Sequence, residues 1–190
     1  MTKIWQMWSG ALPADILDRI ENECQRYPSV DRAGLGHRGE TTLSEYRTSD
    51  IKWINKENEQ SSFIADILWS YAKEANRNAF GFDVDYFSEI QYTTYFGSEG
   101  GKYEWHHDTF WGNDSKYDRK ITVVIQMSDP EDYEGGVFEL DGQYEGPNLQ
   151  DLQRRGTVLV FPSFIPHRVT EVTKGVRKTL ITWVEGPKFR

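Results

Sequence analysis

The sequence predicts a mainly β protein: a double-stranded β-helix, or jelly roll, with flanking helices packed on one side. Hydrophobic residues recur at helical spacing in two stretches of the first 80 residues, whereas from Asp85 onward the apolar runs are short and separated by turn residues. Two helices followed by seven or eight short strands fit a jelly roll. No break in composition divides the chain, so we expect one domain over 1–190, with helical support in 1–84 and the jelly-roll core in 85–184.

The helices are expected over 11–25 and 61–80, where apolar residues recur three and four positions apart. A Ser-Gly pair precedes the first helix and a Tyr-Pro pair follows it, which are suitable boundary signals. The segment between the helices, 31–50, is polar and rich in glycine, so we expect a mobile loop there.

The strands are expected where short apolar runs alternate with turns such as Asp-Pro, Gly-Gly and Lys-Gly. They fall at 86–96, 103–108, 120–127, 136–140, 156–161, 166–172 and 176–184.

Composition excludes several classes of protein. The net charge of −8 comes from 30 acidic against 22 basic residues, and no basic stripe offers a nucleic-acid surface. No apolar run approaches the roughly 18–20 residues that span a bilayer, and the first residues lack the pattern of a signal peptide. One cysteine, Cys24, permits neither an intrachain disulfide nor a cysteine-based metal site, and its place on the apolar stripe of a helix argues against catalysis. We therefore expect a cytoplasmic protein with no nucleic-acid or membrane partner.

His106, Asp108 and His167 are the candidate metal ligands. A His and an Asp two positions apart on a strand point to the same face, whereas His107 points away. Such a pair alone is common by chance, but a second histidine follows on another predicted strand. Two imidazoles and one carboxylate on one side of a metal leave its other positions open, which is typical of non-haem Fe(II) oxygenases.

Arg177, ten residues after His167, is a candidate anion-binding residue. On a strand it shares a face with Thr179, Ile181 and Trp183, and an arginine among such neighbours is expected to face a cavity. A buried guanidinium needs a paired anion, for which a carboxylate is well suited, and the Thr179 hydroxyl can add a contact. A surface ion pair is the alternative for Arg177.

These residues belong to a longer series of motifs. The series, in chain order, is Tyr95-Phe96-Gly97, Tyr103-Glu104-Trp105-His106-His107-Asp108, Asp129-Pro130-Glu131-Asp132-Tyr133-Glu134-Gly135-Gly136, Phe161-Pro162, His167-Arg168-Val169 and Gly175-Val176-Arg177. Over about 85–184 the chain resembles the Fe(II)- and 2-oxoglutarate-dependent dioxygenases, in particular the prolyl 4-hydroxylase-like branch. The first 80 residues carry no diagnostic motif.

The resemblance implies a role for each matching residue. His106, Asp108 and His167 would bind Fe(II), and Arg177 would bind the C5 carboxylate of 2-oxoglutarate. Further contacts in and around the co-substrate site would come from less firmly matched residues: Tyr95 (with Tyr92 as the alternative), Tyr103, Gln126 and Thr179.

The resemblance also implies a reaction, in which 2-oxoglutarate and O2 yield succinate and CO2 as a substrate C–H bond is hydroxylated. Ascorbate is a candidate reductant. The leading substrate is a protein or peptide side chain such as proline, and a small amino-acid-like molecule is the alternative. Halogenation is disfavoured because Asp108 occupies the position that a halide needs. A non-catalytic metal- or peptide-binding jelly roll and a zinc hydrolase remain alternatives, although the hydrolase would lack an evident general base.

Other residues have weaker interpretations. Trp105 and Trp111 flank the metal motif and would form either a substrate platform or part of the core. The mixed-charge stretch 116–120 is expected at the surface, with Arg119 or Lys120 as possible substrate contacts, and the acidic stretch 131–134 as a solvated hairpin. The loop 31–50 is a candidate lid, in which Arg32, Arg38, Tyr46 and Arg47 would grip a peptide; an ordinary surface loop is the alternative.

Overall fold

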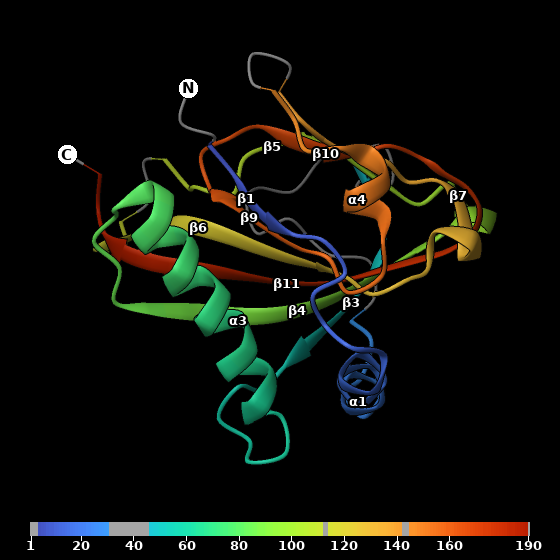
Figure 1. Cartoon of the computed structure of the whole chain (residues 1–190), viewed down its shortest axis with the longest axis horizontal. Helices are drawn as coiled ribbons and strands as arrows, with labels where there is room; N and C mark the ends of the chain where they lie inside the picture. The colour runs from blue at the N-terminus through green and yellow to red at the C-terminus, as the bar shows by residue number, and fades with distance from the viewer. Residues whose placement is uncertain (1–3, 31–45, 112–113, 142–144, 190) are drawn as a thin grey trace.

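The computed structural model describes residues 4–30, 46–111, 114–141 and 145–189 and shows two facing antiparallel sheets. In this part of the chain the larger sheet has the strand order β1-β9-β6-β11-β4-β3, with β7 paired to β11, and the smaller has the order β2-β5-β10-β8. Figure 1 shows the small sheet lying over one face of the large one. The prediction of a mainly β jelly roll is confirmed.

The strands of the large sheet come from both ends of the chain. They are β1 (Gln6–Trp8), β3 (Asp50–Ile54), β4 (Tyr86–Phe96), β6 (Tyr117–Gln126), β7 (Tyr133–Gly135), β9 (Val158–Pro162) and β11 (Val172–Pro187). Those of the small sheet are β2 (Arg47–Thr48), β5 (Lys102–His106), β8 (Phe138–Leu140) and β10 (His167–Val169).

Two helices cover the outer face of the large sheet. They are α1 (Ala14–Gln25) and α3 (Ser62–Ala75), which a π-helical turn, η1 (Asn76–Phe80), extends up to Gly81. Helix α1 begins later than predicted because Pro13 is extended (φ −69°, ψ 155°), and a residue that precedes proline disfavours helical geometry. Shorter helical segments are η2 (Gly97–Glu99), η3 (Pro130–Asp132) and α4 (Leu149–Gln153).

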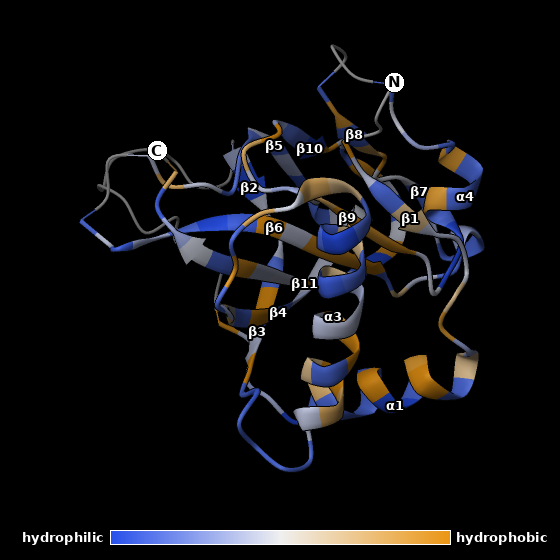
Figure 2. Ribbon diagram, turned by 60° about the vertical axis from the view of Figure 1, so that its left-hand side comes forward, coloured by the Kyte–Doolittle hydropathy of each residue, from blue (hydrophilic) through white to orange (hydrophobic). Residues whose placement is uncertain are grey.

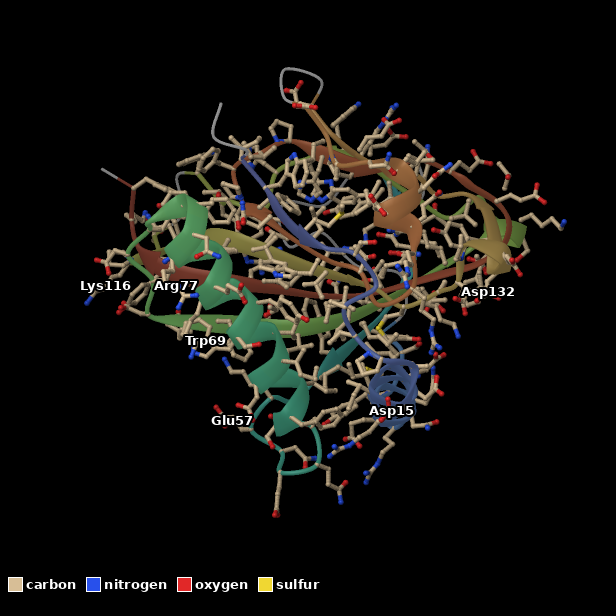
Figure 3. The ribbon with its side chains drawn as sticks, viewed as in Figure 1. Asp15, Glu57, Trp69, Arg77, Lys116 and Asp132 are labelled. Atoms are coloured by element: carbon tan, nitrogen blue, oxygen red, sulfur yellow. The ribbon has the colours of Figure 1, made fainter. Side chains whose placement is uncertain are left out.

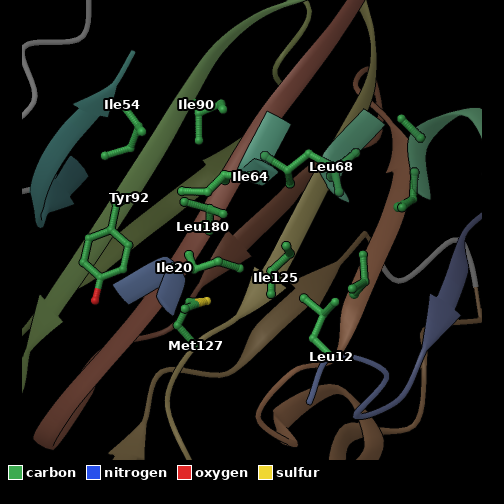
Figure 4. Close-up of a cluster of buried hydrophobic side chains, with 14 of the residues drawn as sticks. Leu12, Ile20, Ile54, Ile64, Leu68, Ile90, Tyr92, Ile125, Met127 and Leu180 are labelled. Atoms are coloured by element: carbon green, nitrogen blue, oxygen red, sulfur yellow. The ribbon is translucent and has the colours of Figure 1, made fainter. Parts of the chain in front are cut away.

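The main hydrophobic core lies between these helices and the large sheet. Ile20 of α1 and Ile64 and Leu68 of α3 are fully buried, and Figure 4 shows them facing Ile125 and Leu180 of the sheet. Along both helices hydrophobic residues alternate with hydrophilic ones (Figure 2), as burial of one face requires. A second core lies between the two sheets and includes Phe138, Phe161 and Val169.

Residues 1–84, which were predicted to give helical support, also supply strands β1, β2 and β3. These strands pair with β9, β5 and β4 respectively. Two- and three-residue edge strands carry almost no periodic signal. The candidate lid lies mostly outside the described residues, and its last part, expected as loop, forms β2 and the start of β3.

Charged side chains occupy the periphery, as Figure 3 shows for Asp15, Glu57, Arg77, Lys116 and Asp132. The acidic stretch 131–134, expected as a solvated hairpin, is exposed at Glu131, Asp132 and Glu134, but it forms a 3-10 turn followed by β7, which pairs with β11. No helix among the described residues is long and apolar enough to cross a membrane.

Candidate metal centre and adjoining cavity

A cavity of about 490 Å³ opens between the two sheets. Its walls come from β3, β4, β6 and β11 of the large sheet and from β2, β5, β8 and β10 of the small one. The residues predicted for the site that line it are His106, Asp108, His167, Arg177, Thr179, Tyr95 and Tyr103. The fold thus brings residues from four strands and one loop to a single hollow.

His106, Asp108 and His167 meet at the inner end of this cavity. One potential ligand atom from each lies within 4.8 Å of the other two. The two histidines are direct cross-strand partners on β5 and β10, so sheet pairing sets their separation. Nε2 of His167 lies 3.5 Å and Nε2 of His106 lies 3.9 Å from the Asp108 carboxylate. A metal ion accepting one atom from each residue fits this arrangement and keeps open positions toward the cavity.

Asp108 reaches this point in a different way from that expected. Strand β5 ends at His106, so the side chain of Asp108 is not placed by the pleat of a continuing strand. Instead, its backbone N–H donates to the Ser163 carbonyl at 2.7 Å, and its carboxylate accepts a 2.7 Å hydrogen bond from the Thr122 hydroxyl. These two contacts fix both the backbone and the carboxylate.

The imidazoles are oriented by backbone carbonyls. Nδ1 of His106 lies 2.7 Å from the Glu104 oxygen, and Nδ1 of His167 lies 2.9 Å from the Ile165 oxygen. A carbonyl oxygen only accepts, so Nδ1 of each ring must carry the proton, and Nε2 of a neutral ring keeps its lone pair. This is the outer-shell arrangement that metal-binding histidines usually have.

The ionisation of His106 and Asp108 suits a cation. Burial, reinforced by the neighbouring His167, lowers the pKa of His106 to about 3, so the ring is neutral at neutral pH. Burial would raise the pKa of Asp108, but the two imidazoles and the Thr122 hydroxyl outweigh it, and the pKa is lowered. Neutral imidazoles and an ionised carboxylate are the forms that bind metals.

Arg177 projects into the same cavity from β11. Its side chain is buried, with the guanidinium carbon 5.6 Å from the ring centroid of its cross-strand partner Tyr95. Within the described part of the chain, its Nε and Nη1 have no hydrogen-bond partner, and neither does the buried Thr179 hydroxyl. Unpaired buried donors are costly, so these atoms fit a bound carboxylate.

The remaining predicted contacts are distributed differently. Tyr95 lines the cavity, whereas Tyr92 faces the helices, with its hydroxyl 3.4 Å from Glu21. Tyr103 lines the cavity and stacks on His106, with ring centroids 3.5 Å apart. Gln126 is buried but does not line the cavity, and its amide donates to the Tyr133 hydroxyl at 2.9 Å.

The two tryptophans beside the metal motif form neither a cavity platform nor part of the core. Trp105 is 41% exposed and Trp111 57% exposed, and neither lines the cavity. Of the basic residues, Arg119 lines the cavity, whereas Lys120 is buried with its amine 3.3 Å from the Phe189 ring centroid. His107 is exposed and lines the cavity outside the ligand trio.

Most of the outer wall of the cavity was not predicted from the sequence. It includes Ile51 and Trp53 of β3 and Glu89 and Gln91 of β4. The alternation of apolar and polar residues in 50–54 carried a weak strand signal, but the neighbouring loop obscured it. Trp183 was expected here and forms part of the wall, with the Arg119 guanidinium carbon 3.9 Å from its ring centroid.

Comparison with known families agrees with this geometry. Residues 90–185, just over half of the chain, match the family model of the 2OG-Fe(II) oxygenase superfamily. The chain belongs to this superfamily. The family's description names Fe(II) and 2OG, which is 2-oxoglutarate, and the trio and the unpartnered guanidinium of Arg177 are compatible with a metal ion and a dicarboxylate.

Curated relatives of this oxygenase carry the name PKHD-type hydroxylase. The chain is 33% identical over 88 residues to the one from Synechococcus sp. (strain CC9311), and 37% identical over 66 residues to the one from Caulobacter sp. (strain K31). These matches cover 46% and 35% of this chain, but only 38% and 28% of the relatives. The similarity is therefore confined to well under half of each relative.

Solved structures share the fold of this oxygenase over nearly its whole length. The viral collagen prolyl hydroxylase from Paramecium Bursaria Chlorella virus-1 superposes with a TM-score of 0.70 at 18% identity, covering 97% of both chains. A Pseudomonas putida prolyl-4-hydroxylase also gives 0.70, at 20% identity, covering 98% of this chain and 95% of its own. At such identities the likeness establishes a prolyl hydroxylase-like fold.

Proposed function

We propose that this chain is a non-haem Fe(II)- and 2-oxoglutarate-dependent dioxygenase that hydroxylates a C–H bond. The observation that carries the proposal is the buried guanidinium of Arg177, whose Nε and Nη1 lack partners among the described residues, in the same cavity as the His106–Asp108–His167 trio. A metal-binding module or a zinc hydrolase would use the trio but would leave this cation unexplained.

Each residue has a defined task in this proposal. His106, Asp108 and His167 bind Fe(II), and Thr122 holds the Asp108 carboxylate in position. Arg177 binds the distal carboxylate of 2-oxoglutarate through two parallel hydrogen bonds, and Thr179 donates a third. Fe(II) with 2-oxoglutarate and O2 supplies the oxidising chemistry, which releases succinate and CO2. Tyr95 and Tyr103 enclose the reactants and limit the access of water.

The proposed substrate is a protein or peptide side chain such as proline. A prolyl hydroxylase from Trichoplax adhaerens, with a TM-score of 0.69 at 17% identity, is described in complex with a hypoxia inducible factor peptide fragment, which supports a peptide. A dioxygenase acting on a small amino-acid-like molecule is the second candidate, because a cavity of about 490 Å³ also suits a small ligand. We also propose a cytoplasmic location, in keeping with a single cysteine that is buried and free.

Anaerobic titration with Fe(II) and then 2-oxoglutarate, followed by exposure to O2 and measurement of succinate, tests this function. His167→Ala should lose most of its bound iron. Arg177→Met should keep the iron but bind 2-oxoglutarate about tenfold to a hundredfold more weakly, because a charge-assisted contact contributes about 1.5–3 kcal/mol.

Lys174→Met is the matched control, since Lys174 lies on the same strand but is exposed and paired with Glu134 at 2.9 Å. The control should bind 2-oxoglutarate as the wild type does. The proposal fails if the wild type forms no succinate, or if Arg177→Met and Lys174→Met bind 2-oxoglutarate equally well.

A further inference from the structure

The cavity contains a second buried cation, Arg47, that the metal and 2-oxoglutarate do not use. It lies on β2 at the edge of the small sheet, directly opposite Tyr103 of β5. Its residue exposure is only 8%, yet it lines the cavity. A short edge strand therefore holds a full positive charge inside a largely apolar hollow.

The contacts of Arg47 satisfy little of its hydrogen-bonding capacity. Its Nε donates to the Ser49 hydroxyl at 2.8 Å, and its guanidinium carbon lies 4.5 Å from the centroid of the Tyr103 ring. Among the described residues, no carboxylate lies within ion-pairing distance of Arg47 and no acceptor bonds to its two Nη atoms. A guanidinium carries five N–H donors, so four have no acceptor in the described part of the chain and are suited to a ligand.

The other arginine in the outer cavity shows what a satisfied guanidinium looks like here. Arg119 lies against the ring of Trp183 and has the Glu89 carboxylate at 3.5 Å. Arg47 also lies against an aromatic ring, but no acidic side chain in the described ranges forms an ion pair with it as Glu89 does with Arg119. An uncompensated buried charge is costly unless a ligand brings the opposite charge.

Arg47 is close to the candidate metal centre. Its guanidinium carbon lies 4.5 Å from the centroid of Tyr103, and that centroid lies 3.5 Å from the centroid of His106, so the guanidinium is within about 8 Å of a candidate ligand ring. An extended peptide advances about 3.3–3.6 Å per residue. A group bound at Arg47 therefore lies within about two residues, or a few bonds, of the carbon facing the metal.

We propose that the substrate carries a carboxylate, bound by Arg47, within about two residues of the carbon that is hydroxylated. The planar fork of the guanidinium matches a carboxylate in two parallel hydrogen bonds. The cavity is also lined by Ile51 and Trp53, and such apolar surroundings strengthen polar contacts. The carboxylate comes from an Asp or Glu next to the reacting residue of a peptide, or from the main-chain carboxylate of a small amino acid. This inference rests on the proposed oxygenase function.

Matched acid and amide ligands test the inference without requiring turnover. The enzyme is loaded with redox-inert Mn(II) and 2-oxoglutarate, and the paramagnetic broadening of ligand NMR signals gives the affinities. The peptide arm compares acetyl-Pro-Asp-amide with acetyl-Pro-Asn-amide, and acetyl-Asp-Pro-amide with acetyl-Asn-Pro-amide. The small-molecule arm compares L-proline with L-prolinamide.

At least one acid should bind about tenfold to a hundredfold more tightly than its amide, and the arm in which this occurs identifies the source of the carboxylate. Arg47→Gln should abolish the preference, and Arg47→Lys should keep part of it because the charge remains. Lys102→Gln is the control, since Lys102 is paired with Glu104 and does not line the cavity.

Two results would overturn the inference: acids that bind no better than amides in every pair, including the case in which none binds, or a preference that survives in Arg47→Gln. Both leave the proposed function standing if the Mn(II)-loaded wild type binds 2-oxoglutarate and the iron form produces succinate. If neither occurs, the oxygenase function itself is wrong.

Discussion

Each candidate metal ligand of this chain is held by a hydrogen bond that leaves its proposed ligand atom free. The two imidazoles donate Nδ1–H to backbone carbonyls, and Asp108 accepts from Thr122. Thr122 is in turn 2.9 Å from the Ser163 hydroxyl, and the Ser163 carbonyl accepts the Asp108 N–H. Neighbouring residues thus hold the Asp108 carboxylate in the position that the proposed metal site needs, which lowers the cost of ordering the site.

Replacing Thr122 by valine should therefore weaken metal binding while the shape of the side chain is kept. Loss of one outer-shell hydrogen bond typically costs tenfold to a hundredfold in metal affinity. Thr182→Val is the matched control, because the Thr182 hydroxyl donates to the Glu89 carbonyl and does not line the cavity. Co(II) titration followed by absorbance should show weaker binding for Thr122→Val alone. Equal affinities in the two variants would mean that Asp108 is positioned without Thr122.

At the residue level, the sequence predicted the site best where suitable residue types also occur in a distinctive order along the chain. Few functions combine a His-x-Asp pair, a distant His and an Arg on predicted strands, and the structure brings His106, Asp108, His167 and Arg177 to one cavity. It did worse for Gln126 and Trp105, since whether a polar or aromatic side chain reaches a cavity depends on its neighbours in space. Arg47 was considered only as part of a flexible lid, and its stacking on Tyr103 could not be inferred without the β2–β5 pairing.

At the level of elements, the site depends on how strand β11 is aligned. Arg177 pairs with Tyr95 of β4, and Thr179 pairs with Gln126 of β6, so the two groups proposed to bind 2-oxoglutarate are set by sheet register. Register shifts occur at and just after Trp183, which lines the cavity: against β4 between Thr182 and Val184, and against β6 between Val184 and Glu185. Such irregularities commonly re-aim side chains beside active sites. The long strands were predictable from alternation, whereas the shifts and the short strands β1, β2 and β7 were not.

Gly136 connects the β7 turn to Arg177. Its φ is +58°, and an added Cβ would lie 2.8 Å from Val172 and 2.9 Å from Cδ of Arg177. An alanine in left-handed backbone geometry costs roughly 1–2 kcal/mol, and here the clash of its Cβ adds to this cost. Gly136→Ala should therefore lower the free energy of unfolding by more than that amount. It should also displace Arg177 and weaken 2-oxoglutarate binding about tenfold, or ~1.4 kcal/mol.

Gly81→Ala separates the two effects. Gly81 has a similar φ of +65°, but no atom lies within 4 Å of the position of its Cβ. In urea unfolding, Gly81→Ala should lose the free energy that left-handed backbone geometry costs an alanine. Its binding of 2-oxoglutarate should be normal. If Gly136→Ala also bound 2-oxoglutarate normally, the turn would not position Arg177.

At the scale of the whole molecule, one sheet is shared by two cores. The helix-side core stabilises the outer face of β4, β6, β9 and β11, and the cavity-side core occupies the inner face of the same strands. Ligands that bind on the inner face should therefore stabilise the helices, because the two cores cannot separate without loss of the sheet between them. The apolar periodicity of the helices predicted the first core, but the second draws part of its residues, such as Phe138 and Val169, from three-residue strands that show no period.

Cys24 of α1 can report this coupling. Its side chain is fully buried in the helix-side core, and burial, followed by the adjacent Glu23 charge, raises the pKa of the thiol to about 12. An unfolded cysteine has a pKa of about 8.5, and only the thiolate reacts quickly. At pH 8 a disulfide reagent should label the folded protein only when it opens. Mn(II) and 2-oxoglutarate at about 100 times their Kd should raise the free energy of opening by ~2.7 kcal/mol. Labelling of Cys24 should then be about a hundredfold slower.

In Arg177→Met, 2-oxoglutarate at the same concentration should lose most of this effect, whereas Lys174→Met should keep it. Labelling that is equally fast with and without ligands would show that α1 opens locally and that the sheet does not couple the two cores. A ligand effect that survived in Arg177→Met would show coupling without the proposed carboxylate contact. Because the thiol lies on the opposite side of the sheet from the ligands, the labelling rate measures transmission through the fold and not contact with the cavity.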